Sequence, residues 1–304
     1  MIELARALGV LVEPPGPEHG SICDSLGIPT PSRADYADIF LFQLFPYASV
    51  YLGPEGKLGG VAADRIAGFF RALGMTPPAQ SDHLAVLLGA YATLCEREGD
   101  EHDDDRRRAW AHARETFLVE HIVSWVPPWL ARVADLGGPP YRAWAGLVNE
   151  FLRAEAARSP RARAMLSAHL IEAPGLPDPR DSPAADFVDG LLAPARCGLI
   201  LTTSDLARAA EDLGVGRRVG ERRFVIRALI DQDAAGLLGW IAAASATASA
   251  AWDTNWYGGT PPGVWWRERC AATSDLLAAL ATEAVRSGGN EAHGHIQDVA
   301  NNAS

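Results

Sequence analysis

Side chains that carry out covalent chemistry form no recognised pattern in this sequence of 304 residues. It has no GxSxG nucleophile motif, no HExxH zinc motif and no P-loop. The glycine-rich run 214–220 lacks the GxGxxG spacing and follows no predicted strand, so we interpret it as a turn between helices. His293 and His295 lie on a tail with few apolar residues, where they would hold a metal only weakly. The residues favour a protein that is not an enzyme and uses no metal or cofactor.

The bulk properties are those of a soluble globular protein. Hydrophobic residues make up 48% of the chain, and the formal net charge is −11. Such a charge disfavours binding to nucleic-acid phosphates or anionic lipids and suits a basic partner. We expect a cytoplasmic location, because residues 1–15 lack the pattern of a secretory signal and the longest apolar stretch, 237–251, is too short to span a bilayer. The four cysteines are far apart, without metal spacing, and we expect reduced thiols: Cys23, Cys95, Cys197 and Cys270.

Two charged segments each allow a structural and a functional interpretation. Segment 96–105 carries seven acidic residues in ten; we favour a solvated loop and helix cap, with attraction of a basic peptide as the alternative. Segment 203–230 resembles a helix-turn-helix with arginines in its second half, which makes a DNA-binding regulator the alternative function. Counted from Thr203 to Asp231, its six arginines face five carboxylates, a net charge of only +1, which is poor for binding phosphate, so we favour plain packing of two helices.

Hydrophobic periodicity is helical almost throughout, which predicts an all-α fold. Apolar residues recur at helical spacing over 66–73, 84–94 and 141–152. A fourth stripe runs from Trp110 to Ser124 on a helix expected to begin near Asp103. Aromatic residues also gather in 252–266, among glycines and prolines. We expect them to pack beneath their own loop, with the anchoring of a partner as the alternative.

Proline and glycine divide the chain into parts. Segment 173–183 contains four prolines, which indicates a linker. We therefore expect a helical core over 1–172, a C-terminal helical part over 184–286 and a disordered tail over 287–304, because the tail has no apolar stripe.

Three segments, in this order, carry a resemblance to a known family. They are 44–52 (LFPYASVYL), 81–84 (SDHL) and 117–127 (FLVEHIVSWVP). Together they resemble the TorD/DmsD/NarJ family of molybdoenzyme-specific chaperones, which share a proline-aromatic-x-Ser-Val-aromatic-Leu stretch, an Asp-His helix start and a downstream His-x-x-x-Trp. The likeness covers roughly 33–155, and 197–230 also looks like the C-terminal part of longer members.

The resemblance implies an all-helical, TorD-like bundle with an additional C-terminal part and no catalytic activity. The implied partner is the catalytic subunit of a molybdopterin-containing oxidoreductase of the dimethyl-sulfoxide-reductase type, held in its apo form for cofactor insertion. A twin-arginine signal peptide is a second implied ligand, if the client carries one. No cofactor, nucleic acid or stable membrane insertion is expected.

The resemblance also suggests where the client binds. Phe117, His121 and Trp125 follow at intervals of four residues, which places them on one face of a single helix. Asp82 stands at a predicted helix start, where it caps the helix or accepts an arginine. We expect the family-like residues to line one groove: Pro46, Tyr47, Ser49, Tyr51, Asp82, His83, Phe117, His121 and Trp125.

Overall fold

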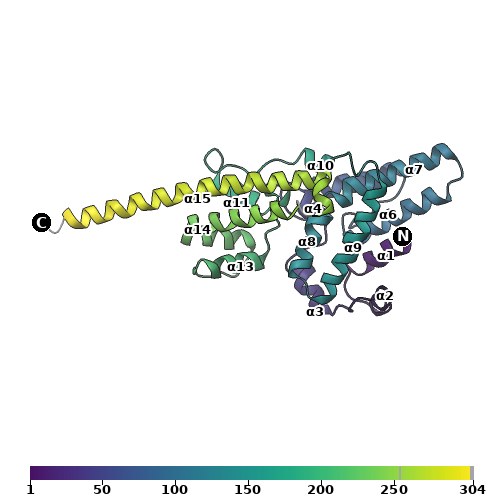
Figure 1. The fold of residues 1–304 in the computed structure, drawn as a ribbon, viewed down its shortest axis with the longest axis horizontal. Coiled ribbons are helices and arrows are strands. Elements are labelled where there is room, and N and C mark those ends of the chain that lie inside the picture. Colours follow the sequence, from purple (N-terminus) through teal and green to yellow (C-terminus); the bar gives the residue numbers. More distant parts are fainter. Residues whose placement is uncertain (253–254, 302–304) are drawn as a thin grey trace.

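The computed structural model describes residues 1–252 and 255–301, and every regular element in them is a helix. The all-α prediction is confirmed. The only β-type contact within these ranges is one isolated antiparallel bridge between Tyr47 and His83. Figure 1 shows an elongated molecule, with the N-terminal helices at one end and the long helix α15 running away from them to the C-terminus.

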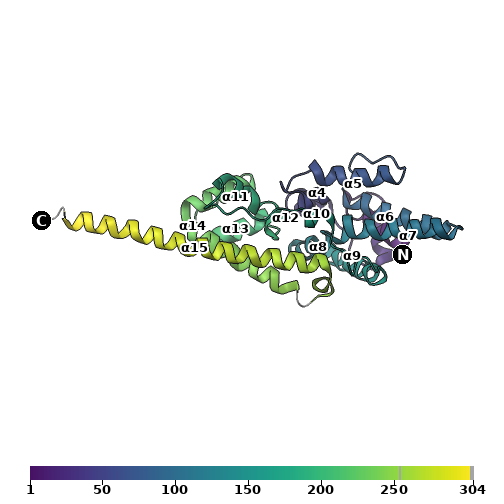
Figure 2. The ribbon, with the colours of Figure 1, turned by 90° about the horizontal axis from the view of Figure 1, so that it is seen from above.

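The N-terminal helices form the wider end of the molecule. Helices α6 and α7 form an antiparallel pair, and α1 packs against α6 while α8 packs against α9 (Figures 1 and 2). The elements of this part are α1 (Ile2–Val10), α2 (His19–Leu26), α3 (Arg33–Tyr36), the π-helix η1 (Ala37–Leu41), α4 (Ala48–Leu52), α5 (Gly60–Ala72), α6 (Leu84–Asp100), α7 (Asp104–Phe117), the π-helix η2 (Leu118–Val123), α8 (Val126–Leu136), α9 (Pro139–Arg158) and α10 (Ala168–Ile171).

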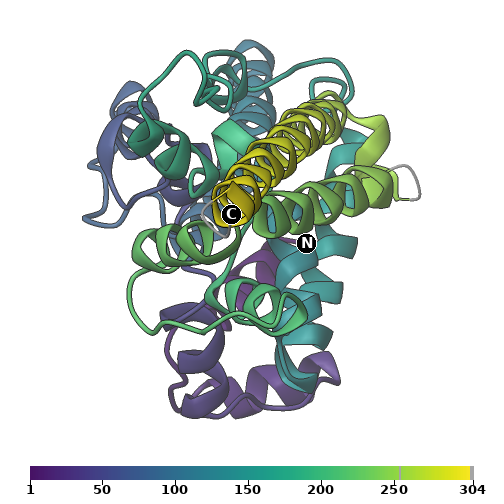
Figure 3. The same ribbon diagram turned by 90° about the vertical axis from the view of Figure 1, so that its left-hand side faces the viewer.

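The C-terminal helices are built around an antiparallel pair, α14 and α15, which lie side by side in Figures 2 and 3. Residues 173–183 contain no helix, and we keep them as the proposed linker. The elements that follow are α11 (Ala184–Leu191), α12 (Pro194–Cys197), α13 (Thr203–Asp212), α14 (Arg222–Ala251), the 3-10 helix η4 (Trp256–Gly259) and α15 (Pro261–Asn301).

Helix α14 is interrupted at Asp233, whose φ of −155° and ψ of 84° are not helical. The Asp233 carboxylate accepts a hydrogen bond from the Gly236 amide (2.8 Å) and so caps the second half of the helix. By length and hydropathy, Arg222–Ala251 is also the one helix among the described residues that meets the requirements of a membrane span. We assign it to the C-terminal bundle, because its apolar residues pack on α13 and α15 and join a buried cluster there.

Aromatic residues after α14 join the two ends of the molecule. Tyr257 and Trp266 are fully buried in the core of the N-terminal helices. The Tyr257 hydroxyl donates to the Val123 carbonyl (2.9 Å), and Trp266 Nε1 donates to the Ser124 carbonyl (2.8 Å). The prediction that the 252–266 aromatics are packing residues is therefore confirmed for these two. Residues 253 and 254 lie outside the described part of the chain.

Helix boundaries agree with the sequence at some points and differ at others. Asp103 caps α7 by accepting from the Arg106 amide (2.8 Å), as predicted. The predicted acidic loop is shorter than expected, because α6 continues to Asp100. Residues 287–301 are drawn as the last part of α15, and 302–304 are not described, so the disorder expected for 287–304 stays a prediction.

The helix expected to carry Phe117, His121 and Trp125 on one face does not continue through all three. Helix α7 ends at Phe117 and the π-helix η2 comes next. A π turn adds a residue to the helical repeat, so the residues after it are rotated to a different face. Trp125 is then the N-cap of α8, which the prolines at 127 and 128 help to start.

Candidate functional site

The first two family-like segments are joined by backbone hydrogen bonds. The Leu84 amide donates to the Pro46 carbonyl, and the Ala48 amide donates to the Asp82 carbonyl, both at 2.9 Å. These contacts hold the start of α4 beside the start of α6, although the two are more than thirty residues apart in sequence. Pro46, Tyr47, Ser49, Asp82 and His83 are therefore brought together, as predicted.

Asp82 and His83 each cap a different helix. The Asp82 carboxylate accepts from the Ser49 amide (3.2 Å) in the first turn of α4, and Asp82 is only 6% exposed. His83 caps α6, because its Nδ1 accepts from the Ala85 amide (3.2 Å). The sequence predicted that Asp82 would cap the helix that follows it; the structure corrects this, since Asp82 caps the neighbouring helix instead. Burial lowers the pKa of His83, and the nearby Asp82 opposes this shift.

The remaining family-like aromatics form a buried layer below these caps. Tyr51 stacks on Trp125 with ring centroids 5.1 Å apart and planes 4° from parallel. The Tyr51 hydroxyl donates to the Phe45 carbonyl (2.8 Å), and Trp125 Nε1 donates to the His121 carbonyl (2.9 Å). Burial raises the pKa of Tyr51. Both buried donors, the Tyr51 hydroxyl and Trp125 Nε1, are therefore paired, as buried polar groups in stable cores are.

His121 lies in an apolar pocket with no hydrogen-bond partner for either ring nitrogen among the described residues. Its ring contacts those of Phe69, Phe117 and His169, with centroids 5.2, 5.2 and 5.6 Å away. Burial lowers the pKa of His121 to about 3 and that of His169 to about 4. Both imidazoles are therefore neutral in the folded protein at pH 7.

The nine predicted site residues thus form a connected cluster. Eight of them are buried, and Tyr47 is partly exposed. The structure does not place an open groove among these side chains. The partly exposed Tyr47 ring meets that of His83 edge-on at 4.8 Å. Contact between this cluster and a client stays a prediction. Because most of these side chains are buried, a client would have to bind the protein surface next to them.

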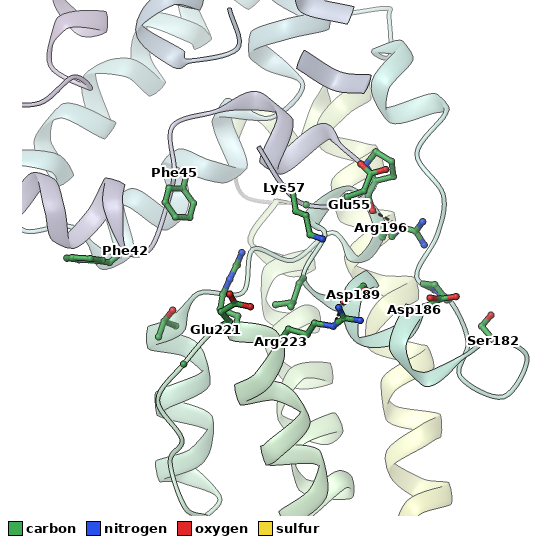
Figure 4. A pocket seen from close by; sticks show the side chains of 17 residues that line it. Phe42, Phe45, Glu55, Lys57, Ser182, Asp186, Asp189, Arg196, Glu221 and Arg223 are labelled. Carbon is green, nitrogen blue, oxygen red and sulfur yellow. Dashed lines mark hydrogen bonds and ion pairs between the residues drawn. The ribbon is translucent and has the colours of Figure 1, made fainter. Parts of the chain in front are cut away.

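A cleft of about 750 Å³ begins next to this cluster at Phe42 and Phe45, although none of the nine residues lines it. One wall consists of Phe42, Phe45 and the loop 54–57, and the other consists of α11, α12 and the start of α14 (Figure 4). Two contacts fix the loop: the Gly59 amide donates to Ser49 Oγ (3.0 Å), and Arg196 Nε donates to the Pro54 carbonyl (2.8 Å). Ser49, a predicted site residue, therefore helps to hold the loop that lines the cleft.

The cleft offers an apolar contact and charges of both signs. Phe42 is 65% exposed on its wall, and Phe45 is partly exposed beside it. The charged residues around it are Arg222 and the following residues, which Figure 4 labels: Glu55, Lys57, Asp186, Asp189, Arg196, Glu221 and Arg223. Sequence reasoning missed this site because its walls come from segments more than a hundred residues apart, and no spacing in the chain signals that they meet.

The helix-turn-helix interpretation of 203–230 is not supported by the geometry. Helices α13 and α14 are joined by residues 213–221, whereas that motif uses a turn of about 3–4 residues. Arg222 is turned inward and donates to the Leu201 carbonyl (2.6 Å), and Arg223 forms an ion pair with Asp189 (2.8 Å). These arginines stabilise the protein's own fold and are not presented to a phosphate backbone.

The acidic segment 96–105 is largely neutralised by neighbouring arginines. Its ion pairs include Glu96 with Arg6, Glu98 with Arg114, Glu101 with Arg106, Asp104 with Arg107, and Asp105 with Arg108. Asp103 is the cap of α7. The arrangement supports the interpretation as a helix cap and surface ion-pair network, since paired acids attract a basic peptide only weakly.

Comparison with known proteins relates the first part of the chain to one family. The family model described as "Nitrate reductase delta subunit" matches residues 30–131. "Chaperone protein TorD" of Vibrio vulnificus (strain CMCP6) is 32% identical over 111 residues, which are 34% of this chain and 51% of that protein. "Chaperone protein TorD" of Shewanella amazonensis (strain ATCC BAA-1098 / SB2B) is 30% identical over 156 residues, 39% of this chain and 62% of that protein.

The chain spans about half the length of the first of these relatives, and the family model ends before α9. The matched range 30–131 nevertheless contains all three family-like segments, the two capping contacts and the buried aromatic layer. The second wall of the cleft lies beyond it. Through this N-terminal part, the chain is similar to the TorD/NarJ chaperone family.

Proposed function

We propose that this protein is a cytoplasmic chaperone that binds the apo catalytic subunit of a molybdopterin-containing oxidoreductase of the dimethyl-sulfoxide-reductase type. It holds that subunit for cofactor insertion and folding, and binds its twin-arginine signal peptide where the client has one. The protein acts by binding rather than by catalysis and carries no cofactor. The match of the family model over residues 30–131 supports the client class.

The observation that carries the proposal is the cleft supported by the family-like residues, with Phe42 exposed on its wall. A large apolar side chain at the edge of a polar cleft is a suitable anchor for an apolar segment of an unfolded client. Carboxylates of the cleft, such as Glu55 and Glu221, provide partners for client arginines. The overall charge of −11 favours the approach of a basic signal peptide.

The test is a calorimetric titration of this chain with the apo catalytic subunit, in wild type and in Phe42→Asp. We expect Phe42→Asp to weaken binding about tenfold, because it replaces an apolar anchor with a charge that has to be desolvated. Val285→Asp is the matched control, since Val285 is also exposed but lies on α15 and does not line the cleft. Equal affinity in all three proteins would remove Phe42 from the client site.

Asp82 allows a structural role to be separated from a binding role. Asp82→Ala should lower the free energy of unfolding by about 1 kcal/mol, because the cap of α4 is lost, whereas Asp82→Asn should change it little, because asparagine is also a good cap. Urea denaturation measures both. We further propose that the carboxylate meets an arginine of the client, in which case Asp82→Asn weakens client binding by roughly tenfold or more. Wild-type affinity in Asp82→Asn would leave Asp82 a capping residue only.

A further inference from the structure

One arginine of the cleft at Phe42 has no carboxylate partner. Arg222 stands at the start of α14, lines the cleft and is partly buried. Its Nη1 donates to the Leu201 carbonyl (2.6 Å). Nε and Nη2 have neither a hydrogen-bond acceptor nor an ion pair within residues 1–252 and 255–301, and both keep accessible surface. Two donor groups of this arginine are therefore open to a ligand in the cleft.

A guanidinium group that is partly removed from water usually has a carboxylate partner, because an unpaired charge is costly to bury. Arg114 is also partly buried, and it forms an ion pair with Glu98 (2.5 Å). At Arg222, burial lowers the pKa, and the groups that oppose this shift are the Tyr51 hydroxyl and the Cys197 thiol. Burial raises the pKa of both groups, so both are uncharged at pH 7. The charge of Arg222 is left for a ligand to neutralise.

The cleft as a whole is neutral, but its charged groups differ in their access to water. Four cations and four carboxylates line it, and among these eight residues the only ion pair joins Arg223 to Asp189 (2.8 Å). The three other carboxylates belong to exposed residues, so water solvates them: Glu55, Asp186 and Glu221. Arg222 is less accessible to water than they are. The charge that gains most from a partner in the cleft is therefore the positive charge of Arg222.

Aromatic surface lies beside this guanidinium group. The Tyr51 hydroxyl donates to the Phe45 carbonyl (2.8 Å), and the same hydroxyl is close enough to influence the pKa of Arg222. Phe42 and Phe45 form the wall opposite Glu221, the residue that precedes Arg222 (Figure 4). Pockets that combine a few placed polar groups with apolar surface select ligands that carry both kinds of group. The cleft therefore suits a carboxylate with an apolar group next to it.

We propose that Arg222 binds a carboxylate of the client, carried next to an apolar side chain that packs on Phe45. Nε and Nη2 lie on the same side of the guanidinium plane and donate to the two carboxylate oxygens, while Nη1 keeps its bond to the Leu201 carbonyl. The inference rests on the proposed function for the source of the carboxylate. It adds a residue that selects which client segment is bound, and this residue lies beyond the family-matched range.

The test uses two pairs of small probes, titrated into the full chain and followed by ligand-detected nuclear magnetic resonance. Acetyl-Phe-Asp-amide and acetyl-Phe-Asn-amide have nearly the same shape and differ in one side-chain charge. Acetyl-Phe and acetyl-Phe-amide differ in the charge of the chain end. Wild type should bind the charged member of a pair about tenfold more tightly. A preference confined to the first pair assigns the site to acidic side chains, and one confined to the second assigns it to chain ends.

Three variants test whether Arg222 causes the preference. Arg222→Met keeps a long side chain without the guanidinium group, and should bind both members of the pair equally. Arg222→Lys keeps the charge but loses the two-pronged geometry, and should retain a preference of only about threefold. Arg227→Met is the matched control, because Arg227 lies further along α14 and does not line the cleft; it should keep the tenfold preference. Circular dichroism melting curves show whether each variant is folded.

Equal affinity for both members of each pair in wild type, or no binding of any probe, would overturn the proposal. So would an unchanged preference in Arg222→Met, or in Arg222→Lys if the methionine variant does not fold. Loss of the preference in Lys57→Met instead would move the carboxylate to another cation of the cleft and overturn the assignment to Arg222. The probes contain no part of the client, so these failures leave binding of the apo subunit as a separate result. A preference at Arg222 without any binding of that subunit would support the carboxylate site and contradict the proposed function.

Discussion

Trp125→Ala should lower the free energy of unfolding by about 3–5 kcal/mol, as large-to-small changes of buried aromatic residues do. Trp125 is fully buried and stacks on Tyr51, and its Nε1 donates to the His121 carbonyl. Alanine leaves a cavity, removes the stacked ring and leaves a buried carbonyl without its donor. Urea denaturation followed by circular dichroism measures the loss.

The control for Trp125 is Trp110→Ala on α7. Trp110 is only partly buried, and its ring centroid lies 5.1 Å from the Arg97 guanidinium carbon. Its removal should cost about 1 kcal/mol, chiefly through the lost cation–π contact and some apolar area. A cost at Trp125 no larger than the cost at Trp110 would contradict the assignment of Trp125 to the buried aromatic layer.

Acidification should destabilise the protein through the buried pair His121 and His169. Their pKa values in the fold are about 3 and about 4, against about 6.5 in an unfolded chain. Below pH 6.5 the unfolded state binds protons that the folded state does not, so stability is fully present above pH 6.5 and is lost as the pH falls toward 4. Between pH 7 and pH 5 the pair should account for roughly 3–4 kcal/mol of lost stability.

The surroundings of the pair explain why protonation is resisted. The rings of Phe69 and Phe117 cover His121, and Arg65, which forms an ion pair with Glu172, adds a positive charge beside both histidines. The Glu120 carboxylate is already occupied, since it accepts from Ser167 Oγ and from the Ala168 amide (both 2.9 Å) at the start of α10. The Glu172 carboxylate opposes the lowering of the pKa of His169, but burial and the positive charge of Arg65 outweigh it.

The double variant His121→Leu/His169→Leu isolates this contribution from that of the other titrating groups. Leucine has no proton to bind, so the variant should lose most of the decrease in stability between pH 7 and pH 5. Urea denaturation at a series of pH values, with wild type beside the variant, measures the difference. The same decrease in both proteins would show that other groups cause the acid sensitivity.

Local patterns predicted much of the helical architecture. The apolar stripes over 66–73 and 84–94 lie on α5 and α6, because one buried face at helical spacing is a strong signal. The cap at Asp103 was also predictable, since capping depends on residues adjacent in sequence. The burial of Tyr257 and Trp266 followed from their size, although the sequence did not indicate which core they would join.

The features that sequence reasoning missed depend on longer-range geometry. The π-helix η2 changes the helical repeat, so Phe117, His121 and Trp125 do not share one face of a single helix. Asp82 caps α4 rather than its own helix because the start of α4 is folded back beside it. The cleft unites Phe42 with residues of α11, α12 and α14, and no local pattern encodes the meeting of segments so far apart.

Recognition of a molybdoenzyme catalytic subunit before its cofactor is inserted is the activity that we propose for this chain. The decisive experiment is a calorimetric titration of the full chain with that subunit from the same organism, once in apo form and once loaded with molybdopterin cofactor. We predict binding of the apo form, with an affinity that depends on Phe42, and affinity for the loaded form at least about tenfold weaker. No binding to the apo form, or equal affinity for the two forms, would contradict the proposed function.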